Sequence, residues 1–114
     1  MANSTLDEPS LAETPIAKRV EAFLAALASH ASPATVAAYR HDLAALCRFT
    51  ERRDVTDPAA LDTALLRAFL GAERSRGLAP RSLARRRAAL SRFADYLVKQ
   101  GVLVDNPVGL LRTP

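Results

Sequence analysis

The sequence predicts an all-α fold, a compact four-helix bundle followed by a short C-terminal helical turn. Apolar residues recur at intervals of three and four in four segments, the spacing that aligns side chains on one face of a helix. Residues suited to a helix start precede these segments. No segment alternates apolar and polar residues, and no Asn-Gly pair indicates a hairpin. We therefore expect helices only, packed on one core.

The first helix is predicted from Thr14 to about Ser29. The Thr14 hydroxyl can cap free backbone N–H groups, and Pro15 suits a first turn because its missing N–H would have no partner there. The apolar arc of this helix comprises Ile16, Val20, Phe23, Leu24 and Leu27. Residues 1–13 are small, polar and acidic without a sustained period, so we expect a flexible N-terminal tail.

Ser32 and Pro33 repeat this pattern and open a second helix that extends to about Arg52. Its apolar arc carries Val36, Tyr39, Leu43, Leu46 and Cys47. The charged residues off this arc are Arg40, His41, Arg48 and Arg52. Cys47 lies on the buried arc, where we expect it to be a small apolar filler.

The segment 53–58 is predicted to be a turn, and Asp62 to cap a third helix. That helix uses Leu65, Leu66, Phe69 and Leu70 as its apolar residues. Gly77 is suited to end it, because glycine readily adopts the left-handed conformation that follows many helices.

The fourth helix is predicted from about Pro80 to Gln100, ending at Gly101. At about 100° per residue, one arc carries Leu83, Leu90, Phe93, Ala94 and Leu97. A narrow stripe opposite it carries Arg81, Arg85, Arg92 and Lys99. Asn106 and Pro107 begin a last short turn with Val108, Leu110 and Leu111. Because the sequence stops shortly after this turn, we expect it to be part of a longer protein.

Positive charge is concentrated in the second half of the chain. Residues 1–50 carry 4 basic and 5 acidic groups, whereas residues 51–114 carry 12 basic and 7 acidic groups. From Arg74 to Arg92 there are seven arginines and no acid. Such a run creates a positive potential that favours a nucleic-acid partner, although a solvated helix face has the same composition. Arg74 and Arg76 fit phosphate contacts and unpaired surface charges equally well.

Catalytic and cofactor signals are absent from the sequence. It has no phosphate-binding glycine loop and no Cys/His pattern for zinc, so we expect no cofactor and no metal. His30 and His41 lack partners for catalysis and are interpreted as surface residues. Tyr39 and Tyr96 are interpreted as packed rings. A single cysteine, no apolar segment of spanning length and no signal peptide favour the cytoplasm.

The N-termini of the second and fourth helices are candidate phosphate-binding sites. Helix N-termini offer N–H groups and partial positive charge to anions. Polar or charged side chains stand at both ends, namely Ser32 and Thr35 in one and Arg81 and Ser82 in the other. We expect the two ends to lie on one face, where they would grip a duplex.

Arg86 and Arg87 border the apolar arc of the fourth helix. For Arg86 two interpretations stay open, a side chain that snorkels past the core and one that reaches DNA from the flank. Arg87 is predicted to be structural, paired with an acid of a neighbouring helix.

Four segments in order, SPATVAAYRHDLAALCRF, LRAFL, RGLAPRSLARRRAALSRFADYLVKQG and DNP, resemble the N-terminal core-binding domain of tyrosine recombinases, most closely the Xer type. The resemblance covers about Ile16 to Pro114. It implies an orthogonal bundle of SAM-like type, bounded by residues 14–111, that clamps a recombination half-site with its second and fourth helices in the major groove. It implies that residues 112–114 begin a linker to a catalytic domain.

The resemblance also places candidate DNA contacts. The Ser-x-x-Thr and Tyr-Arg of the family fall on Ser32, Thr35, Tyr39 and Arg40, and its Arg-Ser and the following Arg fall on Arg81, Ser82 and Arg85. Arg86 and Arg92 complete our predicted set from the charge pattern. Two positions depart from the family. Ala79 stands where a capping Thr or Ser is common, so the cap must come from elsewhere, and Arg87 stands where a leucine is common.

The catalytic residues of such recombinases belong to a second domain, so this chain alone is not expected to be an enzyme. The resemblance implies double-stranded DNA as partner, together with other recombinase subunits in a synaptic complex and a septal DNA translocase bound through the catalytic domain. Chromosome dimer resolution and DNA integration both stay open as the biological role. Two alternatives from other classes are a helical protein-interaction module with an acidic partner and a stand-alone dimeric DNA-binding regulator.

Overall fold

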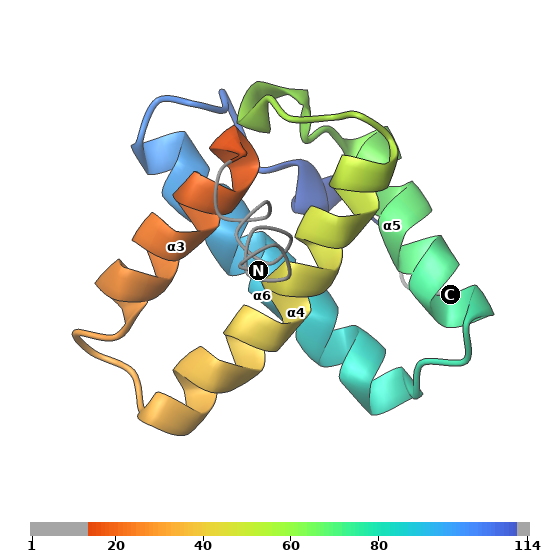
Figure 1. Ribbon diagram of the computed structural model, residues 1–114, viewed down its shortest axis with the longest axis horizontal. Helices are drawn as coiled ribbons and strands as arrows, with labels where there is room; N and C mark the ends of the chain where they lie inside the picture. Colours follow the sequence, from red (N-terminus) through yellow and green to blue (C-terminus); the bar gives the residue numbers. More distant parts are fainter. Residues whose placement is uncertain (1–13, 112–114) are drawn as a thin grey trace, which may run out of the picture. The chain divides into compact units, whose positions relative to one another are not determined.

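Helices account for all the regular structure between residues 14 and 111, the part of the chain that this computed structural model describes (Figure 1). They are α3 (Pro15–Leu27), α4 (Pro33–Arg52), α5 (Thr63–Ser75) and α6 (Pro80–Lys99), with the short 3-10 turns η1 (Pro58–Ala60) and η2 (Pro107–Leu110). The predicted all-α class is confirmed, and every predicted helix is present. The predictions of a tail at 1–13 and a linker at 112–114 lie outside the described residues.

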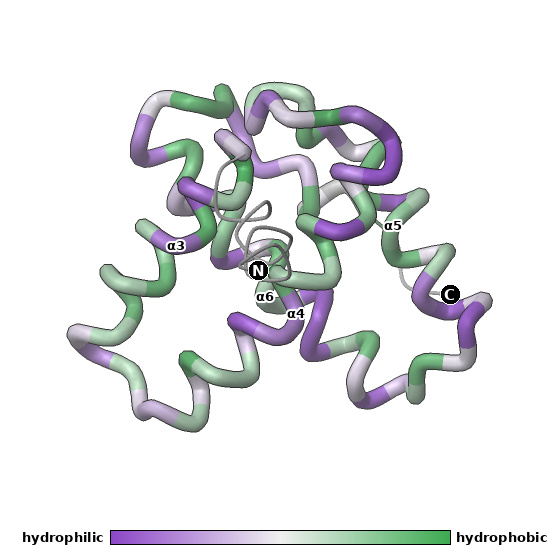
Figure 2. The backbone as a smooth tube through the Cα atoms, viewed as in Figure 1, coloured by the Kyte–Doolittle hydropathy of each residue, from purple (hydrophilic) through white to green (hydrophobic). Residues whose placement is uncertain are grey.

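Contacts divide the chain into two compact units, with the boundary between Pro58 and Ala59. The first unit contains α3 and α4, and the second contains α5, α6 and η2. Within each unit, hydrophobic and hydrophilic stretches alternate along the helices, as amphipathic helices require (Figure 2). The single core shared by all four helices and the domain boundaries at 14 and 111 stay predictions.

In the first unit, local capping sets the helix starts. The Ala17 N–H donates to the Thr14 hydroxyl at 3.0 Å, and the Thr35 N–H donates to the Ser32 hydroxyl at 3.1 Å. A short loop joins α3 to α4, which contact each other along the resulting helical hairpin (Figure 1). The buried apolar residues of these two helices are Ile16, Ala17, Val20, Phe23, Leu24, Leu27, Leu43, Ala45, Leu46, Cys47 and Phe49.

The end of α4 falls where the sequence predicts it. Asp54 adopts the left-handed conformation with φ of 58°, and the Val55 N–H closes the last turn on the Thr50 carbonyl at 2.9 Å. Asp tolerates this conformation better than most residues. The apolar arc predicted for α4 is partly confirmed, since Leu43, Leu46 and Cys47 are buried. Val36 and Tyr39, nearer the N-terminus, are half-buried.

In the second unit, α5 starts at its predicted cap, where the Leu65 N–H donates to the Asp62 carboxylate at 2.9 Å. Gly77 ends α5 with φ of 93°, and Gly101 ends α6 with φ of 76°. Leu66 and Phe69 are buried on α5. On α6 the buried apolar residues are Ala89, Leu90, Phe93, Ala94 and Leu97.

The last turn, η2, contacts both helices of the second unit. Asn106 caps it and donates from its amide to the Asp95 carboxylate at 2.8 Å and to the Ser91 carbonyl at 3.1 Å. The Thr63 hydroxyl donates to the Pro107 carbonyl at 2.9 Å. Because Val108 is also buried, η2 is an integral part of the second unit.

Candidate nucleic-acid interface

The first turn of α4 is an exposed polar helix start. The Ser32 hydroxyl accepts the Thr35 N–H and donates to the Thr35 hydroxyl at 3.0 Å, so the two side chains hold each other in place. Both residues are exposed. The positive end of the helix dipole and two hydroxyl groups therefore face solvent together, an arrangement that suits an anion.

Arg40 lies farther along α4 and is also exposed. Its guanidinium pairs with the Glu21 carboxylate of α3 at 2.7 Å, and both side chains are 53% exposed. Exposed pairs of this kind contribute little to stability, so the contact can be exchanged for another anion at small cost. Tyr39, the residue before it, is half-buried, which agrees with a ring packed at the rim.

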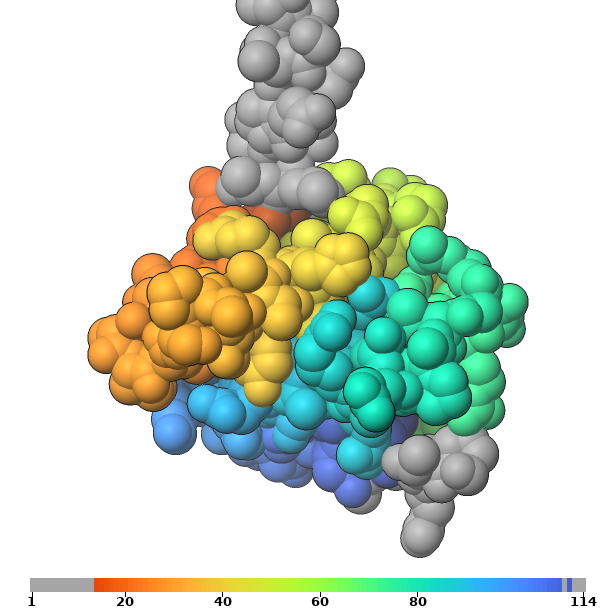
Figure 3. Space-filling view, turned by 90° about the horizontal axis from the view of Figure 1, so that it is seen from below, coloured from red at the N-terminus to blue at the C-terminus, as the bar shows by residue number. Residues whose placement is uncertain are grey.

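The first turn of α6 has no side-chain cap. Ala79 occupies the N-cap position and makes no side-chain cap hydrogen bond. The connection from α5 and the first turn of α6 form part of the molecular surface (Figure 3). Arg81 lies in this turn and is exposed, whereas Ser82 is half-buried.

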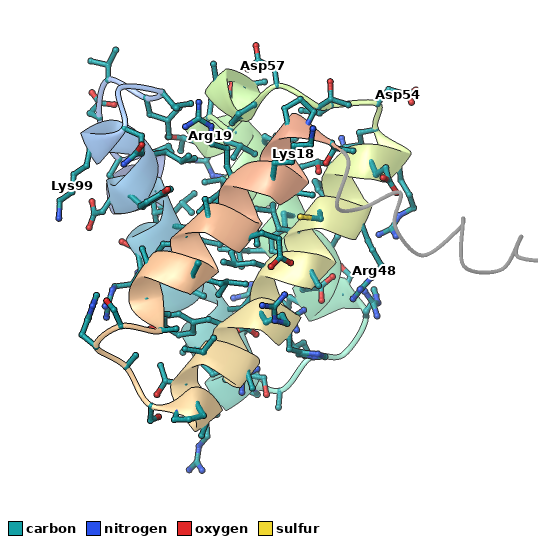
Figure 4. The ribbon with its side chains drawn as sticks, turned by 60° about the vertical axis from the view of Figure 1, so that its left-hand side comes forward. Lys18, Arg19, Arg48, Asp54, Asp57 and Lys99 are labelled. Carbon is teal, nitrogen blue, oxygen red and sulfur yellow. The ribbon has the colours of Figure 1, made fainter. Side chains whose placement is uncertain are left out.

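The basic stripe predicted on α6 is exposed along its whole length. We define the basic stripe as Arg81, Arg85, Arg92 and Lys99, all four of which are exposed. Lys99 projects outward from the last turn of α6 (Figure 4). The only acid on this helix is Asp95, whose carboxylate accepts a hydrogen bond from Asn106. The stripe therefore places four cationic side chains along five turns of one helix.

Arg86 was predicted to contact DNA, and the structure corrects this prediction. It is 3% exposed, and its guanidinium donates to one oxygen of the Glu73 carboxylate, itself 3% exposed. The other oxygen of Glu73 accepts from Arg76 at 2.9 Å. A buried and paired Arg86 is not available to a duplex, so it has a structural role and is excluded from the contacts proposed below.

The sequence contained a signal for this ion pair. Arg86 stands four and seven residues before Leu90 and Phe93, on the buried arc of α6. Glu73 stands four and seven residues after Phe69 and Leu66, on the buried arc of α5. Opposite charges at core positions of consecutive helices favour each other, because neither can be buried alone.

Arg87 is structural, as predicted, but its partner is different. Its guanidinium donates to the Leu111 backbone carbonyl at 2.6 Å, while its Nε is buried without a partner. The structure gives Arg87 a backbone carbonyl in place of the acid that the sequence suggested. The bond to Leu111 ties the residue after η2 to α6.

The two histidines lie outside the basic stripe. His30 and His41 are exposed, as predicted for surface residues. No group of three His, Cys, Asp or Glu residues in the described part of the chain could hold a metal ion. None of the helices between residues 14 and 111 is both long and apolar enough to cross a membrane.

Cys47 is buried, as predicted. Its environment should make the stability of the fold depend on pH. Burial, with smaller contributions from Glu51 and Glu21, raises the pKa of the Cys47 thiol from 9.0 to about 11. The folded state therefore keeps this proton at pH values where the unfolded state releases it. We expect stability to be lost as the pH rises from about 9 to about 11. Urea unfolding at several pH values measures this loss of stability. In Cys47→Ala, the free energy of unfolding should fall less over the same pH range. An identical fall in the variant would contradict the role of the Cys47 thiol.

Comparison with known proteins places the chain in a family. Residues 20–101 match the model of the phage integrase N-terminal SAM-like domain. The tyrosine recombinase XerC of Chromohalobacter salexigens is 66% identical over 95 residues, which cover 83% of this chain and 32% of that protein. The tyrosine recombinase XerC of Xanthomonas campestris pv. campestris is 43% identical over 115 residues, covering 99% of this chain and 32% of the relative. No solved structure matches. The chain thus spans about a third of the length of these relatives.

Proposed function

Because the chain belongs to the phage integrase N-terminal SAM-like family and is a Xer-type N-terminal domain, we propose that it is the DNA-binding domain of a site-specific tyrosine recombinase. In this proposal, residues 14–111 clamp one side of a recombination half-site for strand exchange. The reaction itself belongs to a catalytic domain that follows in the full-length protein. The observation that carries the proposal is the exposed basic stripe on α6.

The chemistry of the stripe supports a phosphate partner. Arginine is charged at every physiological pH, and its planar fork matches two phosphate oxygens or the O6 and N7 atoms of guanine. Arg81 is placed best, because it stands in the uncapped first turn of α6 where the helix dipole adds positive potential. Arg85 and Arg92 continue the same face, and Ser82 adds a hydroxyl beside Arg81.

The start of α4 supplies the second set of proposed contacts. Ser32 and Thr35 offer exposed hydroxyls at the helix N-terminus, and Arg40 offers a guanidinium farther along the helix. Tyr39 contributes a half-buried ring. We propose that these residues and those of α6 face one duplex with α4 and α6 in the major groove. Their position on a common face remains part of the proposal.

The wider biological setting follows from the same proposal. Similarity to proteins called tyrosine recombinase XerC supports a cytoplasmic recombinase whose partners are duplex DNA and further recombinase subunits in a synaptic complex. A septal DNA translocase would act through the catalytic domain. In this proposal, the strand exchange serves either chromosome dimer resolution or DNA integration.

The salt dependence of binding tests the proposal. About 4 to 6 phosphate contacts would make log affinity fall with log salt at a slope of roughly −4 to −5, because each contact releases condensed counterions. Fluorescence anisotropy with a labelled duplex, between about 50 and 200 mM salt, measures this slope. Because phosphate contacts fix register and carry little sequence information, we expect modest sequence preference. Absent or salt-independent binding would contradict the proposal.

The Glu21–Arg40 pair leads to a further prediction. Glu21→Gln is expected to strengthen duplex binding by about 1.5- to 5-fold, because Arg40 no longer has to leave an acid to reach phosphate, and exposed pairs are worth up to about 1 kcal/mol. The control Asp54→Asn removes the same charge from an exposed site on the loop that follows α4 (Figure 4). The gain should vanish in an Arg40→Ala background. An equal gain in both Glu21→Gln and Asp54→Asn would show only a net-charge effect.

A further inference from the structure

Glu73 connects three segments of the second unit. Its side chain is 4% exposed, and its two carboxylate oxygens accept from Arg86 of α6 and from Arg76 at the end of α5. Its backbone carbonyl accepts the Leu78 N–H at 3.1 Å. One residue thus binds α6, the last turn of α5 and the connection between the two helices.

Helix stability alone does not explain an acid at this position. Glu73 lies in the last turn of α5, where the helix dipole disfavours negative charge. A buried ion pair also pays a desolvation cost that often cancels its attraction, so an apolar pair of similar size would stabilise the unit equally well. What the ion pair adds is geometry, since a carboxylate bound at both oxygens permits few arrangements of its partners.

That geometry bears on the start of α6, which has no capping side chain. On one side of this start, Leu78 is bound to the Glu73 carbonyl, only three residues before Arg81. On the other side, Arg86 is bound to the Glu73 carboxylate, five residues after Arg81. Two contacts to the same residue therefore bracket the turns that carry Arg81 and Arg85.

We propose that Glu73 is a positioning residue for DNA binding, which fixes the first turns of α6 against α5 and so sets the direction of Arg81 and Arg85. The inference rests on the proposed function, since it assigns a role to a residue that a duplex never touches. A change at Glu73 should therefore lower duplex affinity through Arg81. A residue needed only for folding would instead affect all the proposed DNA contacts equally.

A double-mutant cycle tests this role. Glu73→Gln alone leaves Arg86 charged and buried, so the test uses Glu73→Gln/Arg86→Met, which removes both charges and retains the apolar volume. In the wild-type chain, we expect Arg81→Ala to raise the duplex Kd about tenfold. In the Glu73→Gln/Arg86→Met background, Kd should already be several-fold higher, and Arg81→Ala should add less than about twofold, because coupled residues are not additive.

Two controls separate positioning from stability. Phe69→Leu shortens a fully buried side chain of α5 and leaves Glu73, Arg76 and Arg86 in the chain, so it should lower the unfolding midpoint and leave Kd unchanged. Glu73→Asp keeps the charge on a shorter side chain. In this background, Arg81→Ala should also raise the duplex Kd by less than it does in the wild-type chain. Circular dichroism under the binding conditions verifies that each variant is folded.

The outcomes are distinct. Additive effects of Arg81→Ala and the Glu73 variants, or an unchanged Kd in those variants, would overturn the positioning role while leaving the proposed function intact. A wild-type chain that does not bind the duplex would instead overturn the proposed function. Reduced coupling in both the Glu73→Gln/Arg86→Met and Glu73→Asp chains, with Phe69→Leu unaffected, supports the inference.

Discussion

Replacing Arg86 by alanine is expected to lower the free energy of unfolding by about 3 kcal/mol, because it leaves a buried carboxylate without its buried partner. Arg76 still binds one oxygen of Glu73. Because the Arg76 side chain is 68% exposed, its ion pair with Glu73 is the weaker of the two. Truncation also removes the stem of a side chain that lies among the core residues of α6. Urea unfolding of the variant measures the loss.

The matched control for this experiment is Arg92→Ala, the same substitution on the same helix. Arg92 is exposed, so its removal should change stability by no more than about 0.5 kcal/mol. The comparison isolates burial and pairing from the loss of a helix-forming arginine. If Arg86→Ala and Arg92→Ala lower the free energy of unfolding equally, the ion pair with Glu73 adds nothing measurable to stability.

The largest expected effect on binding is that of Arg81→Ala, which should weaken duplex affinity by about 1 to 3 kcal/mol if the arginine contacts guanine. A contact to phosphate alone would instead weaken binding to all duplexes uniformly and reduce the salt slope by about 1. Anisotropy titrations with duplexes that differ in sequence distinguish these contacts. Unfolding midpoints should be unchanged, because Arg81 is exposed.

Arg67→Ala is the control for Arg81→Ala. Arg67 is an exposed arginine of α5 outside the proposed contact set, so its substitution removes the same charge and the same side chain. Only a general electrostatic loss is expected from it. If Arg67→Ala and Arg81→Ala weaken binding equally, the domain responds to net charge and the first turn of α6 has no particular role.

Helix boundaries were predictable from the sequence because local interactions set them. Thr14 and Ser32 cap their helices with hydrogen bonds to residues three positions later, so all the atoms involved lie in one short segment. Gly77 and Gly101 end their helices through a backbone conformation that glycine favours. Each of these signals is complete within a few residues.

The partners of the arginines were not predictable in the same way. Arg86 and Glu73 are thirteen residues apart, and Arg87 bonds to a backbone carbonyl twenty-four residues away. A helical wheel shows which residues approach the core but not which atoms they meet there. Glu73 itself was missed, although its spacing of four and seven residues from Phe69 and Leu66 puts it on the buried arc of α5.

The exposed part of the candidate interface was better predicted than the buried part. All four residues of the basic stripe are exposed, and so are Ser32, Thr35 and Arg40. Amphipathic periodicity decides which residues face solvent, and this information lies within one helix. The pairing of Arg40 with Glu21 was not predicted, because it joins two helices.

The most direct test of the account is the mapping of a duplex onto the chain by NMR. Backbone amide shifts of the labelled chain would be followed while duplex DNA is added. We predict that the largest changes fall in the first turns of α4 and α6, at residues 32–40 and 81–85, and saturate together as one binding event. Changes concentrated elsewhere, with those two segments unaffected, would contradict the proposal that the two helix starts hold the DNA.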